Sequence, residues 1–177
     1  MKRYAGLLRA VNVGGRKVEM ARLREAAAGA GFHEPRTLLA SGNILFGTEL
    51  SAAEAERRLE RVIEGAFGLF SEVMVRDPEQ LKAVAAANPF PRQAADEPSR
   101  LMAVFLSGAP QAGLETLESA CAFGEEVRPG PGCLYVFFPR GAGTSKLSNV
   151  VMERRLKVRG TARNWNTVGK LIAALED

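Results

Sequence analysis

The sequence predicts an α+β fold of two ferredoxin-like halves, each with the element order βαββαβ and an antiparallel sheet covered by helices. Two observations lead to this prediction. Short apolar stretches with strand character alternate with longer stretches in which apolar residues recur at helical spacing. The same order of stretches occurs on both sides of a proline-rich segment, residues 89–99. This order is the split βαβ arrangement of ferredoxin-like domains.

The composition is that of a globular protein. The 177 residues are 46% hydrophobic, which is enough for one ordinary domain or two small ones. We expect a first half at 1–88, a proline-rich linker at 89–99 and a second half at 100–177. No run of eighteen apolar residues and no signal-peptide pattern occurs, and the two cysteines have neither metal-site nor disulfide-framework spacing. These features predict a cytoplasmic protein without a membrane partner.

In the first half, apolar runs predict four strands, and the turn at 41–43 joins the second and third into a hairpin. Ser51 and Glu54 have the spacing of a capping box, in which each side chain bonds the backbone N–H of the other residue at a helix start. Asp77 caps the next helix, with Pro78 at its first position. The expected strands span 3–9, 35–40, 44–46 and 72–76, and the expected helices span 20–30, 51–67 and 78–87.

The second half repeats this order. A strand at 101–106 precedes a helix at 111–120, and the residues 129–132, Pro-Gly-Pro-Gly, form the turn between two further strands. The remaining strands are expected at 125–128, 134–138 and 158–162, and the remaining helices at 145–156 and 165–175. The repeat is one of element order, without residue-by-residue identity between the halves.

Positive charge is concentrated near both ends of the sequence. Residues 1–24 carry a net charge of +6 and residues 140–170 a net charge of +7, whereas residues 25–139 carry −7. If the fold brings the two basic segments together, they form one surface that attracts anions. The alternative is two solvated faces that point apart.

The first candidate site follows the first strand. Its glycine pair lets the backbone turn tightly and lets a ligand approach closely. A strand–loop–helix corner presents free N–H groups where negative charge is favoured, and the flanking cations add to this attraction. The alternative is a turn made of turn-forming residues. The candidate residues are Arg9, Asn12, Gly14, Gly15, Arg16 and Lys17.

The second candidate is the turn Ser41, Gly42 and Asn43. Serine and asparagine side chains commonly cap turns, so a purely structural role is the alternative. In a binding site, these residues would converge with the first candidate.

The third candidate is Lys146. The stretch from Gly141 to Lys146 is similar to a phosphate-binding loop but differs from it in spacing. The alternative is a flexible loop in which Ser145 caps the next helix. A capped helix start beside Lys146 can also receive an anion.

The fourth candidate lies within residues 161–167. Asn164 is suited to cap the last helix, Arg163 precedes it, and Trp165 begins the helix. An arginine, an asparagine and an aromatic ring at one helix start can hold a phosphate and stack a base or a sugar. The alternative is a core tryptophan beside an arginine that pairs with a carboxylate.

Signals for catalysis and metal binding are scarce. His33 is the only histidine and lies in a loop, so we expect a surface residue. Neither a G-x-x-x-x-G-K-[ST] nor a G-x-G-x-x-G motif occurs. Glu115, Glu118, Glu125 and Glu126 are expected to be solvated charges. The sequence therefore assigns no catalytic residue, no metal and no cofactor.

Several short sequence motifs are spread over essentially the whole chain, and their order matches that of a known family. They include Leu-Leu-Arg-Ala-Val-Asn-Val-Gly-Gly at 7–15, Ser-Gly-Asn at 41–43, Asn-Pro-Phe at 88–90, Ser-Lys-Leu at 145–147 and Thr-x-Arg-Asn-Trp-Asn-Thr-Val at 161–168. In them the chain resembles the bacterial family labelled domain of unknown function 1697. The resemblance implies a duplicated ferredoxin-like α+β fold and no established activity. Leu38 stands where that family usually has a tyrosine, so a role for the tyrosine hydroxyl is not expected.

From these features we expect a protein that binds a phosphate-bearing ligand on a basic surface formed by both ends of the chain. The ligand is a small molecule or single-stranded nucleic acid. One alternative is an enzyme that acts on a small phosphorylated or carboxylated molecule in a cleft between the halves. Another is that the motifs are purely structural. The sequence assigns neither a reaction, nor the identity of the ligand, nor an oligomeric state.

Overall fold

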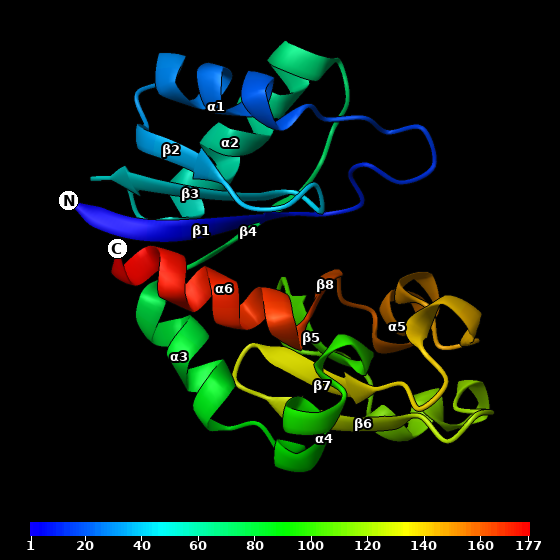
Figure 1. Ribbon diagram of the computed structural model, residues 1–177. Coiled ribbons are helices and arrows are strands. Elements are labelled where there is room, and N and C mark those ends of the chain that lie inside the picture. The colour runs from blue at the N-terminus through cyan, green and yellow to red at the C-terminus, as the bar shows by residue number, and fades with distance from the viewer. The chain divides into compact units, whose positions relative to one another are not determined.

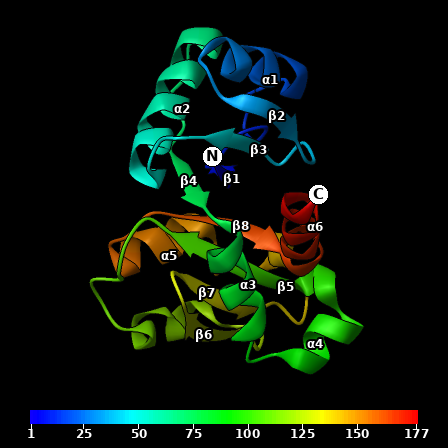
Figure 2. The same ribbon diagram turned by 90° about the vertical axis from the view of Figure 1, so that its left-hand side faces the viewer.

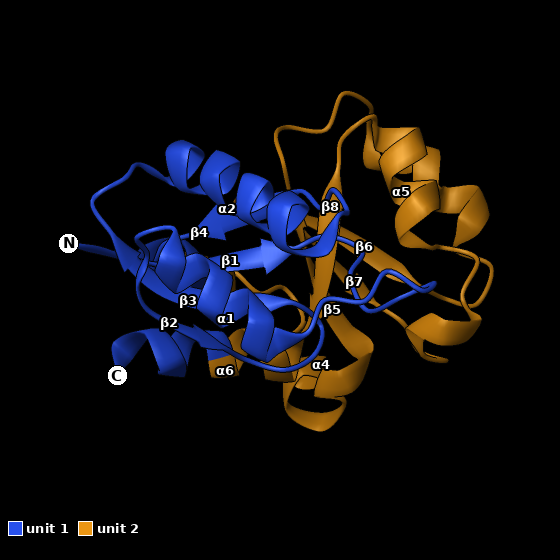
Figure 3. Cartoon of the chain, turned by 90° about the horizontal axis from the view of Figure 1, so that it is seen from above, with its two compact units in different colours: residues 1–81, 171–177 blue, residues 82–170 orange.

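The computed structural model describes residues 1–177 and has a mixed α+β architecture (Figure 1). It contains two four-stranded antiparallel sheets, each packed against helices, so the predicted fold class is confirmed. The chain divides into two compact units, which Figure 3 distinguishes by colour. Unit 1 comprises residues 1–81 and 171–177, and unit 2 comprises residues 82–170.

Unit 1 contains the first sheet and two helices that cover one of its faces. In chain order its elements are β1 (Lys2–Leu8), α1 (Met20–Gly29), β2 (His33–Thr37), β3 (Asn43–Thr48), α2 (Ala52–Phe67) and β4 (Val73–Arg76). The strands lie in the order β2-β3-β1-β4, and every neighbouring pair is antiparallel. This is the order of a ferredoxin-like βαββαβ unit, whose first and third strands are central.

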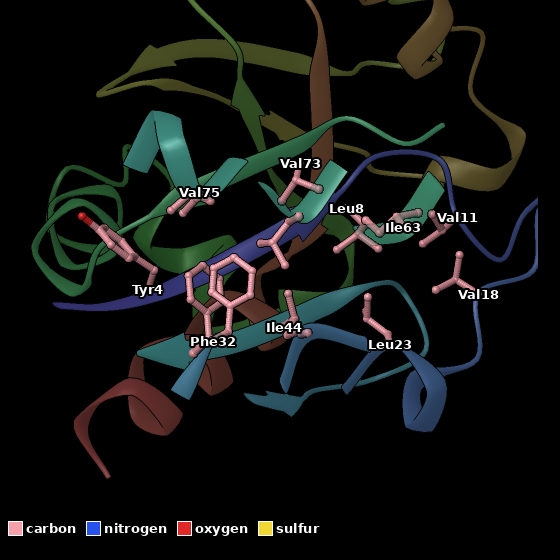
Figure 4. Packing of buried hydrophobic residues seen from close by; sticks show 14 residues of the cluster. Tyr4, Leu8, Val11, Val18, Leu23, Phe32, Ile44, Ile63, Val73 and Val75 are labelled. Carbon is pink, nitrogen blue, oxygen red and sulfur yellow. The ribbon is translucent and has the colours of Figure 1, made fainter. Parts of the chain in front are cut away.

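The core of unit 1 lies between this sheet and the helices α1 and α2. Its strand residues are Tyr4, Leu8, Ile44, Phe46, Val73 and Val75 (Figure 4). They alternate along their strands because successive side chains of a strand point to opposite faces. Val11 and Val18, near the two ends of the loop between β1 and α1, belong to the same cluster. The core therefore anchors both ends of this loop.

The predicted capping box at the start of α2 is confirmed. The Ser51 N–H donates to Glu54 Oε2 at 2.9 Å, and the Glu54 N–H donates to Ser51 Oγ at 3.4 Å. Each side chain thus satisfies a backbone donor that the first turn of the helix leaves without an intrahelical partner.

Two helices contain residues of both units, α3 (Pro78–Ala86) and α6 (Trp165–Glu176). The end of α6, residues 171–177, groups with unit 1. There the Arg36 guanidinium donates a hydrogen bond to the Ala174 carbonyl at 2.7 Å.

Unit 2 contains the second sheet (Figure 2). Its elements are α4 (Pro91–Asp96), η1 (Pro98–Arg100), β5 (Leu101–Leu106), η2 (Leu114–Ala120), β6 (Glu126–Gly130), β7 (Cys133–Phe137), η3 (Ala142–Thr144), α5 (Asn149–Leu156) and β8 (Gly160–Asn164), where η denotes a 3₁₀ helix. The strands lie in the order β6-β7-β5-β8, which repeats the first sheet strand for strand. No helix of the protein is both long enough and apolar enough to cross a lipid bilayer.

Some elements differ from the sequence prediction. The α-helix expected at 111–120 is the 3₁₀ helix η2, because its first turn has the tighter bond of the Thr116 N–H to the Gly113 carbonyl at 3.1 Å. The strands expected at 35–40 and 158–162 are shifted, to His33–Thr37 and Gly160–Asn164.

The segment 89–99, predicted to be a linker, is ordered by an aromatic side chain. Phe90 is buried, its ring lies 6.4 Å from the Phe137 ring, and the Arg128 guanidinium lies 5.9 Å from its centroid. Burial of a phenylalanine offsets part of the entropy cost of ordering the segment. The compact units divide after Leu81 and Lys170, while the expected halves at 1–88 and 100–177 with a linker at 89–99 stay a prediction.

Candidate functional site

The loop between β1 and α1, residues 9–19, is closed at its base by the Asn12 side chain. Its amide nitrogen donates to the Val18 carbonyl at 3.2 Å and to the Ala40 carbonyl, while its amide oxygen accepts from the Val18 N–H at 2.9 Å. The backbone φ of Asn12 is +56°, a left-handed conformation that asparagine adopts more readily than most residues. Asn12 therefore closes the loop and ties it to the segment between β2 and β3.

Arg16 ties the same loop to the segment between α2 and β4. Its Nε donates to the Ala10 carbonyl at 2.9 Å, and its guanidinium also donates to the Phe70 carbonyl. These bonds give Arg16 a structural role in unit 1. Its charge still adds to the positive potential around the loop.

The tip of the loop presents backbone N–H groups to solvent. Val13, Gly14 and Gly15 are exposed, and their N–H groups donate no hydrogen bond within the protein. Gly14 and Gly15 have φ values of +56° and +81°. Lys17 is also exposed, and its Nζ lies 3.9 Å from Glu19 Oε1, a separation at which an exposed ion pair contributes little. Successive N–H groups in turns of this kind form concavities that bind anions.

The second candidate stretch forms the tight turn between β2 and β3. Asn43 has an exposed fraction of 0%, and its amide nitrogen donates to the Leu38 carbonyl at 2.7 Å and to Ser41 Oγ at 3.0 Å. Ser41 is exposed. The buried asparagine therefore shapes this turn, and Ser41 is its solvent-facing polar group.

Gly42 packs this turn against the first loop. The Leu8 N–H donates to the Gly42 carbonyl at 2.8 Å. The φ of Gly42 is +90°, and a Cβ at this position would lie 2.5 Å from Val11 Cγ2 and 3.0 Å from Leu8 Cβ. Only glycine fits both this conformation and this close approach.

Three neighbouring segments thus form one end of unit 1, and we call residues 9–19, 38–43 and 68–72 the loop end. The hydrogen bonds of Asn12 to Ala40 and of Arg16 to Phe70 join them. The loop after β1 extends outward from the unit, as Figures 1 and 3 show. The structure therefore brings the first and second candidate stretches together.

The loop end also exposes apolar side chains. Val13 is 57% exposed and Phe70 is 54% exposed, whereas most large apolar side chains of unit 1 are buried. Leu39 is exposed as well. Sequence reasoning missed Phe70, whose position beside Arg16 results from a contact between residues far apart in the chain.

In unit 2, Asn164 caps α6 as predicted. Its Oδ1 accepts from the Thr167 N–H at 3.0 Å and from the Thr167 hydroxyl at 3.2 Å. Trp165 is partly buried, and its ring lies 6.3 Å from the ring of Tyr135, which is fully buried. Trp165 therefore packs near Tyr135 and keeps part of its surface exposed.

Arg163 is only 5% exposed and lies on the sheet face opposite the apolar cluster of unit 2. Its guanidinium donates to Thr161 Oγ1 at 2.6 Å and to the Ala162 carbonyl at 2.9 Å. Its cross-strand neighbour is Ala103, a small residue that leaves room for the longer side chain. Burial lowers the pKa of Arg163 to about 10, so the guanidinium is charged at neutral pH. Arg163 is thus a buried cation of unit 2.

Glu125 was expected to be a solvated charge, and this prediction is wrong because Glu125 is 7% exposed. Its carboxylate accepts hydrogen bonds from the Phe123 N–H at 2.9 Å and from the Ser145 hydroxyl at 2.8 Å. Burial on its own raises the pKa of Glu125, but these hydrogen bonds and the nearby Arg140 together hold the pKa below its ordinary value. Glu125 is therefore a buried, hydrogen-bonded carboxylate.

Ser145 does not cap the following helix, contrary to expectation. Its hydroxyl bonds Glu125, and α5 begins at Asn149, where Ser148 Oγ accepts from the Val151 N–H at 3.2 Å. Lys146 is exposed. It precedes Leu147, a member of the apolar cluster, whereas Arg163 lies on the other face of the sheet. Lys146 is thus an exposed cation of a loop, whereas Arg163 is a buried cation of β8.

Sequence reasoning also missed a cavity of about 680 Å³ in unit 2, which is lined by Arg154 and Lys157. In the sequence these residues stand out only by their contribution to the net charge of residues 140–170. The signal that points to them is the run of cations at the end of α5, where Arg154, Arg155, Lys157 and Arg159 occur within six residues.

Comparisons with known proteins agree with this architecture. A family described as "Protein of unknown function (DUF1697)" matches residues 1–135. The conserved bacterial protein SP0830 from Streptococcus pneumoniae has a similar structure, with a TM-score of 0.75 and 21% sequence identity, over 100% of this chain and 99% of that one. At this identity the likeness concerns the fold alone. No protein with a curated description matches the chain.

Proposed function

The chain belongs to the DUF1697 family, and we propose that it binds a phosphate-bearing ligand at the loop end of unit 1. The proposal retains Arg9, Asn12, Gly14, Gly15, Arg16, Lys17, Ser41, Gly42 and Asn43 as the residues that form or shape this site. A cytoplasmic location, expected from the cysteine usage, is part of the same proposal.

One observation carries the proposal, namely the three consecutive N–H groups of Val13, Gly14 and Gly15 that have no acceptor within the protein. The loop that presents them is held at its base by Asn12 and Arg16, so its two ends are fixed without a ligand. An anion at the tip would accept from these donors, and Lys17 would add a mobile positive charge. Such preorganisation reduces the entropy cost of binding.

Single-stranded nucleic acid fits the loop end better than a lone phosphate does. Proteins that bind single strands combine cations that follow the phosphates with aromatic side chains on which bases stack. The loop end has both features, since Phe70 is 54% exposed, accepts a hydrogen bond from Arg16 through its backbone carbonyl, and lies in the same group of loops as Lys17. The proposed arrangement places phosphate oxygens at the loop tip and a base on Phe70.

The test is binding of a fluorescently labelled single-stranded oligonucleotide, measured by anisotropy at several salt concentrations. If Lys17 contacts a phosphate, Lys17→Ala reduces the slope of log affinity against log salt by about 0.7. Phe70→Ala should lower affinity by about 1–3 kcal/mol, the usual contribution of one stacked base. Competition with a nucleoside monophosphate and with pyrophosphate separates a nucleic-acid site from a site for small phosphorylated molecules.

Lys2→Ala is the matched control. Lys2 is an exposed cation of unit 1 at the opposite end of β1, away from the loop. Equal effects of Lys17→Ala and Lys2→Ala would show that only overall charge matters. An affinity that is absent, or that does not change with salt, would refute the proposal.

A further inference from the structure

Unit 2 contains two adjacent cavities, of which only the first is lined by charged residues, and both are lined by Gly108 and Ala109. The first is the cavity of about 680 Å³ that is lined by Arg154 and Lys157. The second, of about 530 Å³, has mainly apolar walls that include Leu106, Pro110 and Leu134. Each volume lies within the range of small-molecule sites, about 300–1,000 Å³.

Backbone hydrogen bonds hold the walls of the first cavity. The segment after β5 is bonded to the segment between α5 and β8, because the Ser107 N–H donates to the Arg159 carbonyl and the Gln111 N–H to the Leu156 carbonyl, each at 2.8 Å. Lys157 follows α5 with a φ of +54°, a left-handed helix end. The cavity is thus built by α5 and by two loop segments that backbone hydrogen bonds tie together.

The first cavity has a net positive charge, and two of its cations have no partner within the protein. Arg154, Lys157 and Arg159 line it together with a single acid, Glu153. The Glu153 carboxylate accepts from the Gly160 N–H at 3.4 Å. The side chains of Arg154 and Lys157 are exposed and form no hydrogen bond or ion pair within the protein. Two cations without partners beside an apolar cavity favour an anion that carries an apolar body.

We propose that unit 2 binds a small amphipathic anion, with its phosphate or carboxylate group at Arg154 and Lys157 and its apolar body in the neighbouring cavity across Gly108. This site is separate from the loop end of unit 1 and does not depend on the function proposed for it. The charged group orients the ligand through charge-assisted hydrogen bonds, and the apolar body contributes most of the surface that is buried on binding.

The test uses 8-anilinonaphthalene-1-sulfonate, an anion with an apolar body, whose fluorescence rises when it enters an apolar site. The full chain should bind it saturably with a stoichiometry of one, while circular dichroism confirms the native fold. Decanoate and decyl phosphate, which share the proposed chemistry, should displace it, and their relative affinities tell a carboxylate from a phosphate ligand. Decanol, which lacks the charge, should compete at least about tenfold more weakly.

Three variants locate the site. Gly108→Phe should abolish binding without disturbing the fold, because a Cβ at Gly108 meets no atom within 4 Å. Arg154→Ala and Lys157→Asn should each weaken binding about tenfold or more, and asparagine tolerates the left-handed backbone at position 157. Arg92→Ala removes an exposed cation of α4 that lines neither cavity, and it should not change binding.

Two results would overturn the proposal. One is an absence of saturable binding of the probe, of decanoate and of decyl phosphate to the native chain. The other is binding that survives in Gly108→Phe with the affinity of the unaltered protein, which would place the probe elsewhere. Loss of binding in Gly108→Phe with a native circular dichroism spectrum and an unchanged unfolding transition supports it.

Discussion

Replacing Gly42 by alanine should destabilise unit 1 by about 2–5 kcal/mol. The left-handed conformation at this position costs a residue with a Cβ about 1–2 kcal/mol. In addition, the new Cβ would lie 2.5 Å from Val11 Cγ2 and 3.0 Å from Leu8 Cβ, so these core residues must move. Overpacking of this kind costs about 1–3 kcal/mol.

Gly14→Ala is the matched control for this prediction. Gly14 also has a positive φ, +56°, but a Cβ there would meet no atom within 4 Å. It should therefore show only the conformational cost of about 1–2 kcal/mol. The difference between the two variants isolates the contact of the turn with Val11 and Leu8.

The assay is equilibrium unfolding in urea, followed by far-ultraviolet circular dichroism for both units. Fluorescence of Trp165, the only tryptophan, reports unit 2 in the same samples. Gly42→Ala should lower the midpoint of the circular dichroism transition clearly more than Gly14→Ala does. Equal midpoints for the two variants would refute the close packing of this turn and the reasoning built on it.

Three further predictions concern single side chains. Ser51→Ala should lower the free energy of unfolding by about 1 kcal/mol through loss of the cap of α2, whereas Ser51→Thr should retain most of it, as urea titrations can show. Tyr135→Phe should cost about 0.5–1.5 kcal/mol, because the buried hydroxyl donates to the Val84 carbonyl at 2.7 Å, and a cost near zero in thermal unfolding would mean that this bond is absent. Glu125 has a folded-state pKa below its ordinary value, so its contribution to stability is present above the unfolded-state pKa and is lost as pH falls through the folded-state pKa. Glu125→Gln should therefore make stability fall less steeply with acidification, and unchanged slopes in urea titrations at neutral and acidic pH would contradict this.

The fold was largely predictable because its signals are local. The capping box at Ser51 and Glu54 marks the start of α2 within four residues, and apolar runs mark β1 and β5. Errors occurred where a local pattern fits two structures. The stretch 114–120 has helical spacing, yet only the three-dimensional structure decides between an α-helix and the tighter 3₁₀ helix.

The candidate site was predictable only in part, because some of its contacts join residues that are distant in the sequence. A turn is predicted by the residue types of Asn12, Gly14 and Gly15. The structure places their loop next to the Ser41–Asn43 turn. The bond between Ser145 and Glu125, in contrast, joins residues that are distant in sequence and carry no shared pattern. Burial of Glu125 therefore could not be read from the sequence, and neither could the neighbourhood of Phe70 and Arg16.

The discontinuous makeup of unit 1 has a consequence for its synthesis. A ribosome makes residues 1–81 first, but residues 171–177 follow only after the whole of unit 2. Until then the nascent chain lacks the Ala174 carbonyl that Arg36 bonds, together with the apolar side chains of Leu171 and Leu175. Domains that are contiguous in sequence can fold as they emerge, the amino-terminal one first. Here the amino-terminal sheet is synthesised first, but unit 1 is completed last by the end of α6, so a chain stalled or cut before Leu171 carries an unfinished unit 1 alongside a fully synthesised unit 2.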